Sequence, residues 1–178
     1  KNIAIEKTFA SMLEVLKEDP DFASRGEDVT EENIQPRLRM TILYALANKL
    51  GGLVLNTGNK TELALGYCTI YGDMAGGLGV IADLNKERVY KLAYYLNEKA
   101  GKERIPLSII ERAPSAELKT GQLDEHGMGA HPQVLSPLVD ALVNGMSLKE
   151  AKASFCEKFE EALIERIFKT LHANEWKR

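Results

Sequence analysis

The residues from Asn56 to Asp73, NTGNKTELALGYCTIYGD, concentrate side chains that can bind a charged ligand. They follow an apolar run at 53–56, and in an open parallel sheet ligands bind beyond the carboxyl ends of the strands. A helix that begins near Lys60 would point its N-terminal amides, which favour an anion, at the same place. Thr57 can donate a hydroxyl hydrogen bond to a phosphate, and the Glu62 carboxylate with phosphate oxygens is a normal environment for Mg²⁺.

From spacing alone, a structural interpretation of the same residues is favoured over ligand binding. In it, Thr57 and Thr61 cap a helix and Glu62 lies in the solvated first turn. Three further cations are candidates for ligand binding: Lys86, Arg37 and Arg39. Lys86 lies at the start of a predicted helix, where the helix dipole makes a positive charge slightly unfavourable. Residues two apart on a helix point about 200° apart, so only one of these arginines can face a given ligand.

Several other patterns are weak. Residues 77–82, GLGVIA, match the dinucleotide fingerprint G-x-G-x-x-A, but they follow a polar turn instead of a strand. His126 and His131 have no cysteine or carboxylate spacing that would make a zinc site. Cys68 is more typical of a small buried residue than of a nucleophile. The chain contains no Walker A sequence.

Alternating strand and helix patterns must position these residues. Strands are expected at 2–5 and 53–56, and helical periodicity is expected at 7–18, 31–50, 60–68 and 86–100. Thr30 is a candidate N-cap, as is Asn85, and glycines at 51–52 and 101 end two helices. Residues 114–131 are expected to be a polar, mobile loop. Two helices follow it, and the first of them begins with a Ser147–Glu150 capping box.

These elements predict an α/β layer fold with helices packed on a parallel sheet. Only two or three strands are visible, and parallel sheets are normally covered on both faces. We therefore expect the sheet to be incomplete within this chain. The broadly apolar helix at 36–50 is consistent with one face on the sheet and another on a partner subunit, or with burial inside one subunit.

Composition sets broader limits. The 178 residues carry a formal net charge of −3, which argues against a general nucleic-acid binder. The two cysteines predict reduced thiols and an intracellular, cytoplasmic protein. No apolar run approaches the roughly 20 residues that span a bilayer, and no signal peptide is visible.

The segment 32–86, from ENIQPRLRM through NTGNKTELALGYCTIYGDMAGGLGVIADLNK, resembles the synthetase domain of NAD⁺ synthetases. It is most similar to the glutamine-dependent, bacterial long form, and the resemblance continues through RAPSAEL, GQLDE and NEWKR, to Arg178. It implies an adenine-nucleotide α-hydrolase-like (ATP pyrophosphatase) three-layer fold. It also implies that ATP adenylates the carboxylate of deamido-NAD⁺, and that ammonia, released from glutamine in the long form, then displaces AMP.

The resemblance also assigns roles to single residues. Thr57, Lys86 and Ser115 match ATP contacts, and Glu62 matches a Mg²⁺ ligand. No side chain is assigned a covalent catalytic role, because positioning and charge carry most of this chemistry. Contacts with deamido-NAD⁺ are implied for a further set: Arg37, Tyr71, Asp73, Trp176 and Lys177.

The chain departs from the family pattern in three respects. Ile70 and Gly77 stand where short-form members carry Lys and Asp, the family's loop S-G-G-x-D-S is not found, and no glutaminase domain is present. We therefore expect residues 1–178 to be the C-terminal part of a synthetase domain, incomplete on its N-terminal side and inactive alone. The resemblance implies a homodimer or higher homo-oligomer. The alternative is a catalytically silent dimerising or ligand-binding module of the same fold.

Overall fold

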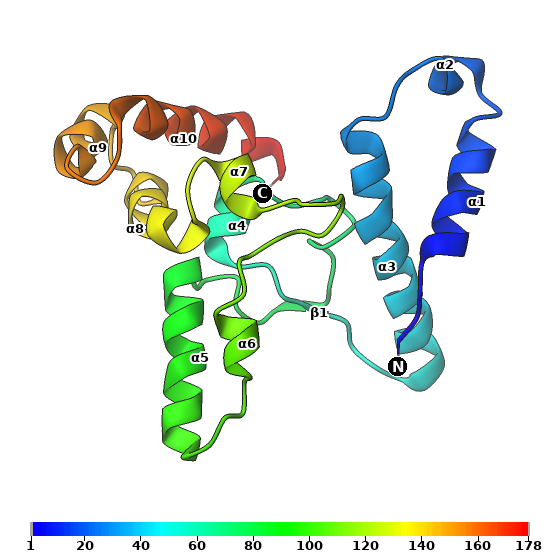
Figure 1. Cartoon of the computed structure of the whole chain (residues 1–178), viewed down its shortest axis with the longest axis horizontal. Helices are drawn as coiled ribbons and strands as arrows, with labels where there is room; N and C mark the ends of the chain where they lie inside the picture. Colours follow the sequence, from blue (N-terminus) through cyan, green and yellow to red (C-terminus); the bar gives the residue numbers. More distant parts are fainter. Residues whose placement is uncertain (1, 178) are drawn as a thin grey trace. The chain divides into compact units, whose positions relative to one another are not determined.

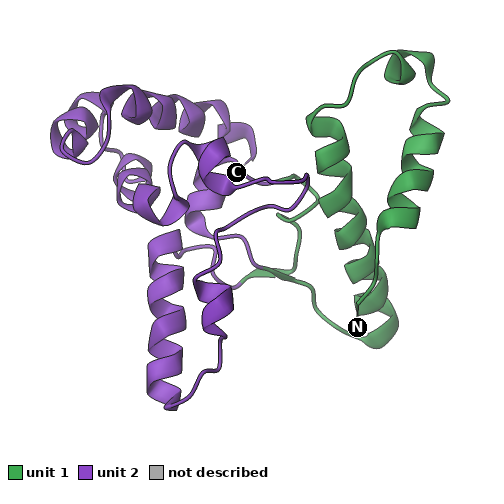
Figure 2. Ribbon diagram, viewed as in Figure 1, with its two compact units in different colours: residues 1–56, 69–79 green, residues 57–68, 80–178 purple. Residues whose placement is uncertain are grey.

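The computed structural model describes residues 2–177, so Lys1 and Arg178, the ends of the predicted domain, lie outside the described residues. The chain divides into two compact units (Figure 2), residues 1–56 with 69–79 and residues 57–68 with 80–178. Unit 1 contains α1 (Glu6–Leu16), α2 (Pro20–Ala23), α3 (Val29–Leu50), β1 (Leu55–Asn56) and β2 (Leu78–Gly79). Unit 2 contains α4 (Lys60–Leu65), α5 (Lys86–Ala100), α6 (Leu107–Ile110), α7 (Asp124–Met128), α8 (Pro132–Val143), α9 (Leu148–Phe155), α10 (Glu161–Ala173) and the 3₁₀ helix η1 (Glu175–Lys177), as Figure 1 shows.

The long helix α3 begins two residues earlier than predicted. Asp28, and not Thr30, is its N-cap: the Asp28 carboxylate accepts from the Thr30 amide at 2.7 Å, and the Asp28 amide donates to Glu31 Oε2 at 2.9 Å. This reciprocal pair satisfies two amides that would otherwise lack partners. Gly51 ends the helix in the left-handed conformation, as predicted, with a φ of 72°.

The sheet is smaller than predicted. β1 and β2 are parallel, with Leu55 opposite Leu78 and Asn56 opposite Gly79, and residues 2–5 form no strand. The prediction of a buried strand over 53–56 was wrong, because Leu53 and Leu55 are 67% and 50% exposed. Val54 and Asn56, by contrast, are 8% and 6% exposed, so one face of this pair is covered and the other is not.

The glycines before β2 allow the two strands to approach. A Cβ atom at Gly77 would lie 2.4 Å from Leu53 Cδ1, and one at Gly76, whose φ is 154°, would lie 2.7 Å from the Asn56 amide nitrogen. The first glycine of the dinucleotide pattern at 77–82 therefore serves close strand packing, and the pattern contains β2. The next helix begins only at Lys86.

Unit 2 carries the hydrophobic core. Leu135, Leu138 and Val139 of α8 pack with Ile164 and Ile167 of α10, and all five are at most 1% exposed. The sequence patterns missed α8, which carries Pro132 in its first turn and a second proline inside it. They also missed α7, which lies in the segment predicted as a polar loop. The capping box of Ser147 with Glu150 is confirmed at the start of α9.

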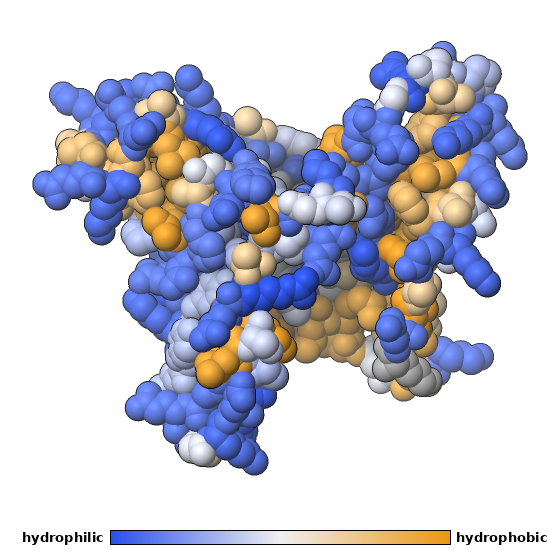
Figure 3. Space-filling model, viewed as in Figure 1, coloured by the Kyte–Doolittle hydropathy of each residue, from blue (hydrophilic) through white to orange (hydrophobic). Residues whose placement is uncertain are grey.

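Apolar side chains also reach the surface of unit 1. Met12 and Val15 of α1 are 39% and 61% exposed, and Leu43 and Leu50 of α3 are 46% and 72% exposed. Figure 3 shows apolar surface on unit 1.

Among residues 2–177, none of the helices is both long enough and apolar enough to cross a membrane.

Candidate nucleotide and metal site

The N-terminus of α4 is built by a capping box. The Asn59 side chain accepts from the Glu62 amide at 3.1 Å, and the Asn59 amide donates to Glu62 Oε2 at 3.2 Å. The structural interpretation of this helix start therefore named the wrong caps, since Asn59 takes the place given to Thr57 and Thr61. Thr57 is exposed just before the helix, and the Thr61 side chain is fully buried.

The N-terminus of α5 is fixed by side chains from three segments. The amides of Lys86, Glu87 and Arg88 donate to Thr61 Oγ1, Ser136 Oγ and Asn85 Oδ1 at 3.1, 3.2 and 2.8 Å. Asn85 is the predicted N-cap. Because side chains already satisfy these three amides, the helix start holds Lys86 in place instead of presenting free amides to an anion.

Two residues predicted separately come together here. Lys86 Nζ lies 2.7 Å from Glu62 Oε1, and these side chains are only 18% and 20% exposed. Charge-assisted hydrogen bonds of this kind are among the stronger ones in proteins. The pair places a cation suited to phosphate beside a carboxylate suited to Mg²⁺, both at helix starts.

Asp124, at the start of α7, is a third charged group near this pair. It is 5% exposed, and its Oδ1 has no hydrogen-bond partner among the described residues. Burial raises the pKa of the Asp124 carboxyl group above the ordinary 3.8, and the Glu62 charge adds to this, while the charge of Lys86 and hydrogen bonds from Ala116 and Tyr67 act in the opposite direction. Sequence reasoning missed this residue, although it lies in the quoted GQLDE segment.

Oxygen donors dominate the site, which suits Mg²⁺. The residues from 2 to 177 contain no cluster of three His, Cys, Asp or Glu side chains able to hold a metal ion alone. One or two carboxylates completed by water and phosphate oxygens are the usual protein environment of Mg²⁺. Glu62 therefore fits a metal that arrives together with a nucleotide.

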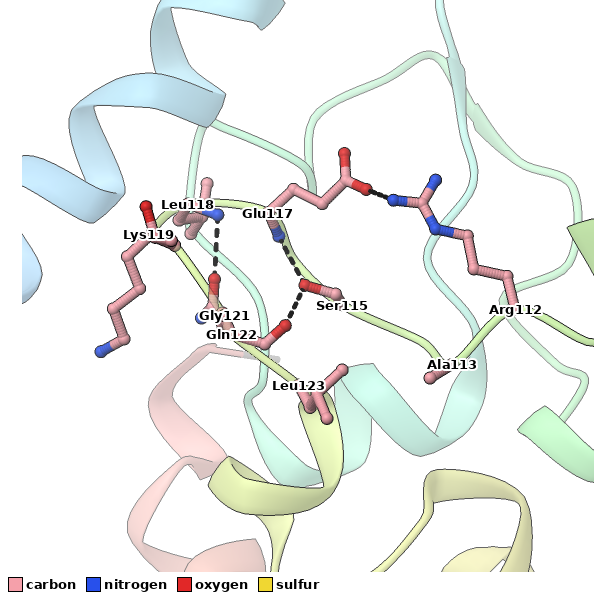
Figure 4. A pocket seen from close by; sticks show the side chains of 10 residues that line it. Arg112, Ala113, Ser115, Glu117, Leu118, Lys119, Gly121, Gln122 and Leu123 are labelled. Carbon is pink, nitrogen blue, oxygen red and sulfur yellow. Dashed lines mark hydrogen bonds and ion pairs between the residues drawn. The ribbon is translucent and has the colours of Figure 1, made fainter.

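Ser115 lies in the loop between α6 and α7. Its hydroxyl donates to the Gln122 carbonyl and accepts from the Glu117 amide, as Figure 4 shows. The loop lines a cavity of about 590 Å³. The Asp124 amide donates to the Pro114 carbonyl at 3.0 Å, so the base of this loop is tied to the start of α7. No described contact joins Ser115 directly to Glu62 or Lys86.

In unit 1, the Tyr71–Gly72–Asp73 turn is bound to α3. Arg37 Nε donates to the Ile70 carbonyl at 3.1 Å, and a Cβ atom at Gly72 would lie 2.9 Å from Pro36 Cβ. Asp73 Oδ1 accepts from the Thr69 amide at 2.8 Å.

Tyr71 has a φ of 61° and is 80% exposed. A positive φ is uncommon for a bulky residue and marks a constrained turn. The turn thus brings together Arg37, Tyr71 and Asp73, three of the predicted deamido-NAD⁺ contacts.

The C-terminal pair is anchored to α4 in unit 2. Lys177 Nζ donates to the carbonyls of Gly66 and Cys68 at 2.7 and 3.1 Å, and Asn174 Nδ2 donates to the Leu65 carbonyl at 3.1 Å. A cation is favourable at a helix C-terminus, where carbonyls lack partners. Trp176 is 70% exposed beside it. The observed contacts of Lys177 are structural, and its predicted contact with a ligand stays a prediction.

A family model described as NAD synthase matches residues 1–178. The chain belongs to the NAD synthase family. It is 43% identical over 164 residues to a glutamine-dependent NAD(+) synthetase of Rhodobacter capsulatus, a match that covers 88% of this chain and 29% of the relative. It is 41% identical over 178 residues to the enzyme of the same name from Xanthomonas campestris, covering 100% and 31%. The chain thus spans about 30% of the length of these curated relatives.

Solved structures also match the chain. An NMN synthetase from Francisella tularensis matches with a TM-score of 0.74 and 30% identity, covering 100% of this chain and 63% of that one. A glutamine-dependent NAD⁺ synthetase from Acinetobacter baumannii, in complex with ADP, matches with a TM-score of 0.58 and 35% identity, covering 98% and 30%. The predicted resemblance to long-form NAD⁺ synthetases is confirmed, and a helical chain with a small parallel sheet is consistent with part of such a domain.

Proposed function

We propose that the protein carrying this chain is a cytoplasmic carbon–nitrogen ligase that converts deamido-NAD⁺ to NAD⁺. The family match over residues 1–178 is the observation that carries this proposal. The ion pair of Glu62 with Lys86 supports it, because it supplies the two charges that a metal–nucleotide complex requires. We further propose that the chain is the C-terminal part of a three-layer ATP pyrophosphatase domain, and that the protein forms a homodimer.

The reaction has two steps. An oxygen of the nicotinate carboxylate attacks the α-phosphorus of ATP, the bond to pyrophosphate breaks, and pyrophosphate leaves. The nitrogen of ammonia, obtained from glutamine or from solution, then attacks the activated carbonyl carbon. The bond to AMP breaks, AMP leaves with its electron pair, and ammonia loses a proton, which gives the amide. Bound Mg²⁺ would screen the phosphate charges during the first step.

The residues of this chain bind and orient the reactants. Lys86 would hold a phosphate oxygen, Glu62 would hold the metal, and Thr57 and Ser115 would contact ATP. Positioning of this kind, with fixed charges nearby, supplies most of the rate enhancement when no covalent enzyme intermediate forms. A further set would contact deamido-NAD⁺: Arg37, Tyr71, Asp73, Trp176 and Lys177.

A second candidate function is the same amide formation on a mononucleotide, with nicotinamide mononucleotide as product. The match to a structure described as an NMN synthetase favours this candidate. The identities of about 40% to NAD(+) synthetases favour the dinucleotide.

One assay tests both candidates. The complete protein is incubated with Mg²⁺, ATP, an ammonium salt and either deamido-NAD⁺ or nicotinate mononucleotide, and products are separated by chromatography. We expect NAD⁺ and AMP in equal amounts from the dinucleotide. Amide formed only from the mononucleotide would replace the first candidate by the second. No amide from either substrate would favour the silent module.

A further inference from the structure

The side chains of Thr61 and Ser136 form a buried hydroxyl pair behind the ion pair of Glu62 with Lys86. Both residues are 0% exposed, and their oxygens lie 3.1 Å apart. Thr61 directly precedes Glu62 in α4, whereas Ser136 belongs to α8, 75 residues further along the chain.

The hydrogen bonds of this pair have a fixed direction. A hydroxyl has one hydrogen and two acceptor lone pairs. Ser136 donates its hydrogen to the Pro132 carbonyl at 2.9 Å, so the hydrogen between the two hydroxyls comes from Thr61. The Lys86 amide donates to Thr61 Oγ1 at 3.1 Å, and the Glu87 amide donates to Ser136 Oγ at 3.2 Å. Both hydroxyl hydrogens and both of these amides therefore have partners.

This directed chain joins three helices at one point. It runs from the first amide of α5, through Thr61 in α4, to Ser136 and a carbonyl of α8. A second link lies nearby, since Asp140 of α8 lies 2.9 Å from Lys60 Nζ and accepts from Asn85. The backbones that carry Glu62 and Lys86 are thus held to each other through α8.

We propose that Thr61 and Ser136 are positioning residues, whose linked hydroxyls hold Lys86 and Glu62 in register for a metal–nucleotide complex. This inference rests on the proposed function and deepens it. It assigns to two buried hydroxyls, neither of which would touch the ligand, a share in nucleotide affinity. A 1 Å displacement of positioning groups is enough to weaken such a site strongly.

The first test is Thr61→Val in the complete protein, because valine keeps the shape and removes the hydroxyl. We expect two constants to rise about tenfold: the dissociation constant for a non-hydrolysable ATP analogue with Mg²⁺, measured by calorimetry, and the KM for ATP. The reason is that the Lys86 amide, beside the site, loses its buried acceptor. Thr61→Ser keeps the oxygen and should stay within about twofold of the wild type. Nucleotide affinity unchanged in Thr61→Val would overturn the proposal.

A matched control separates positioning from stability. Ser147→Ala removes the hydroxyl N-cap of α9, whose capping box is similar but is not linked to α4 or α5 in the described contacts. We expect it to lower the melting temperature without changing nucleotide affinity. An equal loss of affinity in Ser147→Ala would show a general stability effect and contradict the proposal.

Two further measures keep the test decisive. Where Thr61→Val fails to fold, Ser136→Ala removes the acceptor of the Glu87 amide and of the Thr61 hydroxyl but keeps the bond from the Lys86 amide to Thr61. It should give a smaller rise in the same two constants, whereas no rise contradicts the proposal. Nucleotide binding requires no turnover. A wild-type protein that binds the analogue but forms no amide would therefore refute the proposed function, while the comparison of variants would still decide the roles of Thr61 and Ser136.

Discussion

Replacing Asp124 by asparagine should stabilise the protein at neutral pH while weakening its activity. Asparagine has nearly the same shape and keeps an oxygen that can accept from Ala116 and Tyr67, but it carries no charge. The wild-type carboxylate is 5% exposed, and its Oδ1 has no partner in the described chain. A buried polar atom in this state costs about 1–3 kcal/mol. Attraction to the nearby Lys86 offsets part of that cost, so we expect a net gain of about 1 kcal/mol.

The gain should depend on pH. Burial raises the pKa of Asp124 in the folded protein above the 3.8 of the unfolded chain. The folded state therefore binds the Asp124 proton more tightly, and the wild type loses stability as pH rises through the raised folded-state pKa. Asparagine does not titrate. The advantage of Asp124→Asn should be full above that pKa and should shrink as pH falls toward 3.8.

Thermal unfolding of the complete protein, followed at pH 7 and at acidic pH, measures both effects. A gain of about 1 kcal/mol corresponds to a rise of roughly 2–4 °C in melting temperature for a domain of this size. Glu125→Gln is the matched control, because Glu125 is the exposed neighbour of Asp124 in α7. A lower melting temperature for Asp124→Asn at pH 7, or a gain that does not change with pH, would refute the reasoning. We also expect this variant to form less amide product.

Three further predictions concern other parts of the chain. Glu62→Ala should raise the Mg²⁺ requirement and lower turnover by about 100-fold, since it removes a charge that acts on the metal; normal turnover at low Mg²⁺ would remove Glu62 from the metal site. Arg37→Ala should weaken deamido-NAD⁺ binding more than ATP binding in calorimetry, and equal losses would indicate a folding effect instead. Gly66→Ala should destabilise the protein by about 2–4 kcal/mol in denaturant unfolding, because its φ is 65° and its Cβ would lie 2.4 Å from Asn174 Cβ. Gly101→Ala, with a φ of 59° and open space around it, should cost only about 1 kcal/mol; equal losses for the two glycines would exclude the contact with Asn174 as the cause.

Local signals predicted the helix ends well. Asn85, Gly51, Gly101 and the box of Ser147 with Glu150 act where expected, because caps and left-handed glycines satisfy backbone groups within a few residues. Thr30 failed for the same local reason, because Asp28 offered a better-placed acceptor and a reciprocal bond from Glu31.

Signals that depend on distant partners were weaker. A strand forms only where a second strand pairs with it. In the apolar run at 53–56, only the last two residues pair with another strand, β2. The helix α8 was missed because its two prolines suggest a break, although Leu135, Leu138, Val139 and Leu142 follow a helical spacing. Pro132 lies in the first turn, where a proline costs no hydrogen bond.

The candidate site was predicted residue by residue and not as an arrangement. Family resemblance singled out Glu62 and Lys86, but only the fold brings residues 24 positions apart to within 2.7 Å. Asp124 was not predicted, because what marks it is a buried carboxylate oxygen, Oδ1, without a hydrogen-bond partner among the described residues. A sequence does not show burial or hydrogen bonding. The ligand-binding roles of all the predicted site residues, Glu62 and Lys86 included, stay predictions.

The most direct test of the account is to locate a metal ion in the complete protein. Crystals grown with Mn²⁺ and a non-hydrolysable ATP analogue, measured at a wavelength where manganese scatters anomalously, would show where the cation binds. We expect an anomalous peak on the Glu62 carboxylate, with the Lys86 ammonium turned from Glu62 toward a phosphate oxygen. A nucleotide bound with manganese elsewhere, and with the ion pair of Glu62 and Lys86 intact, would contradict this expectation.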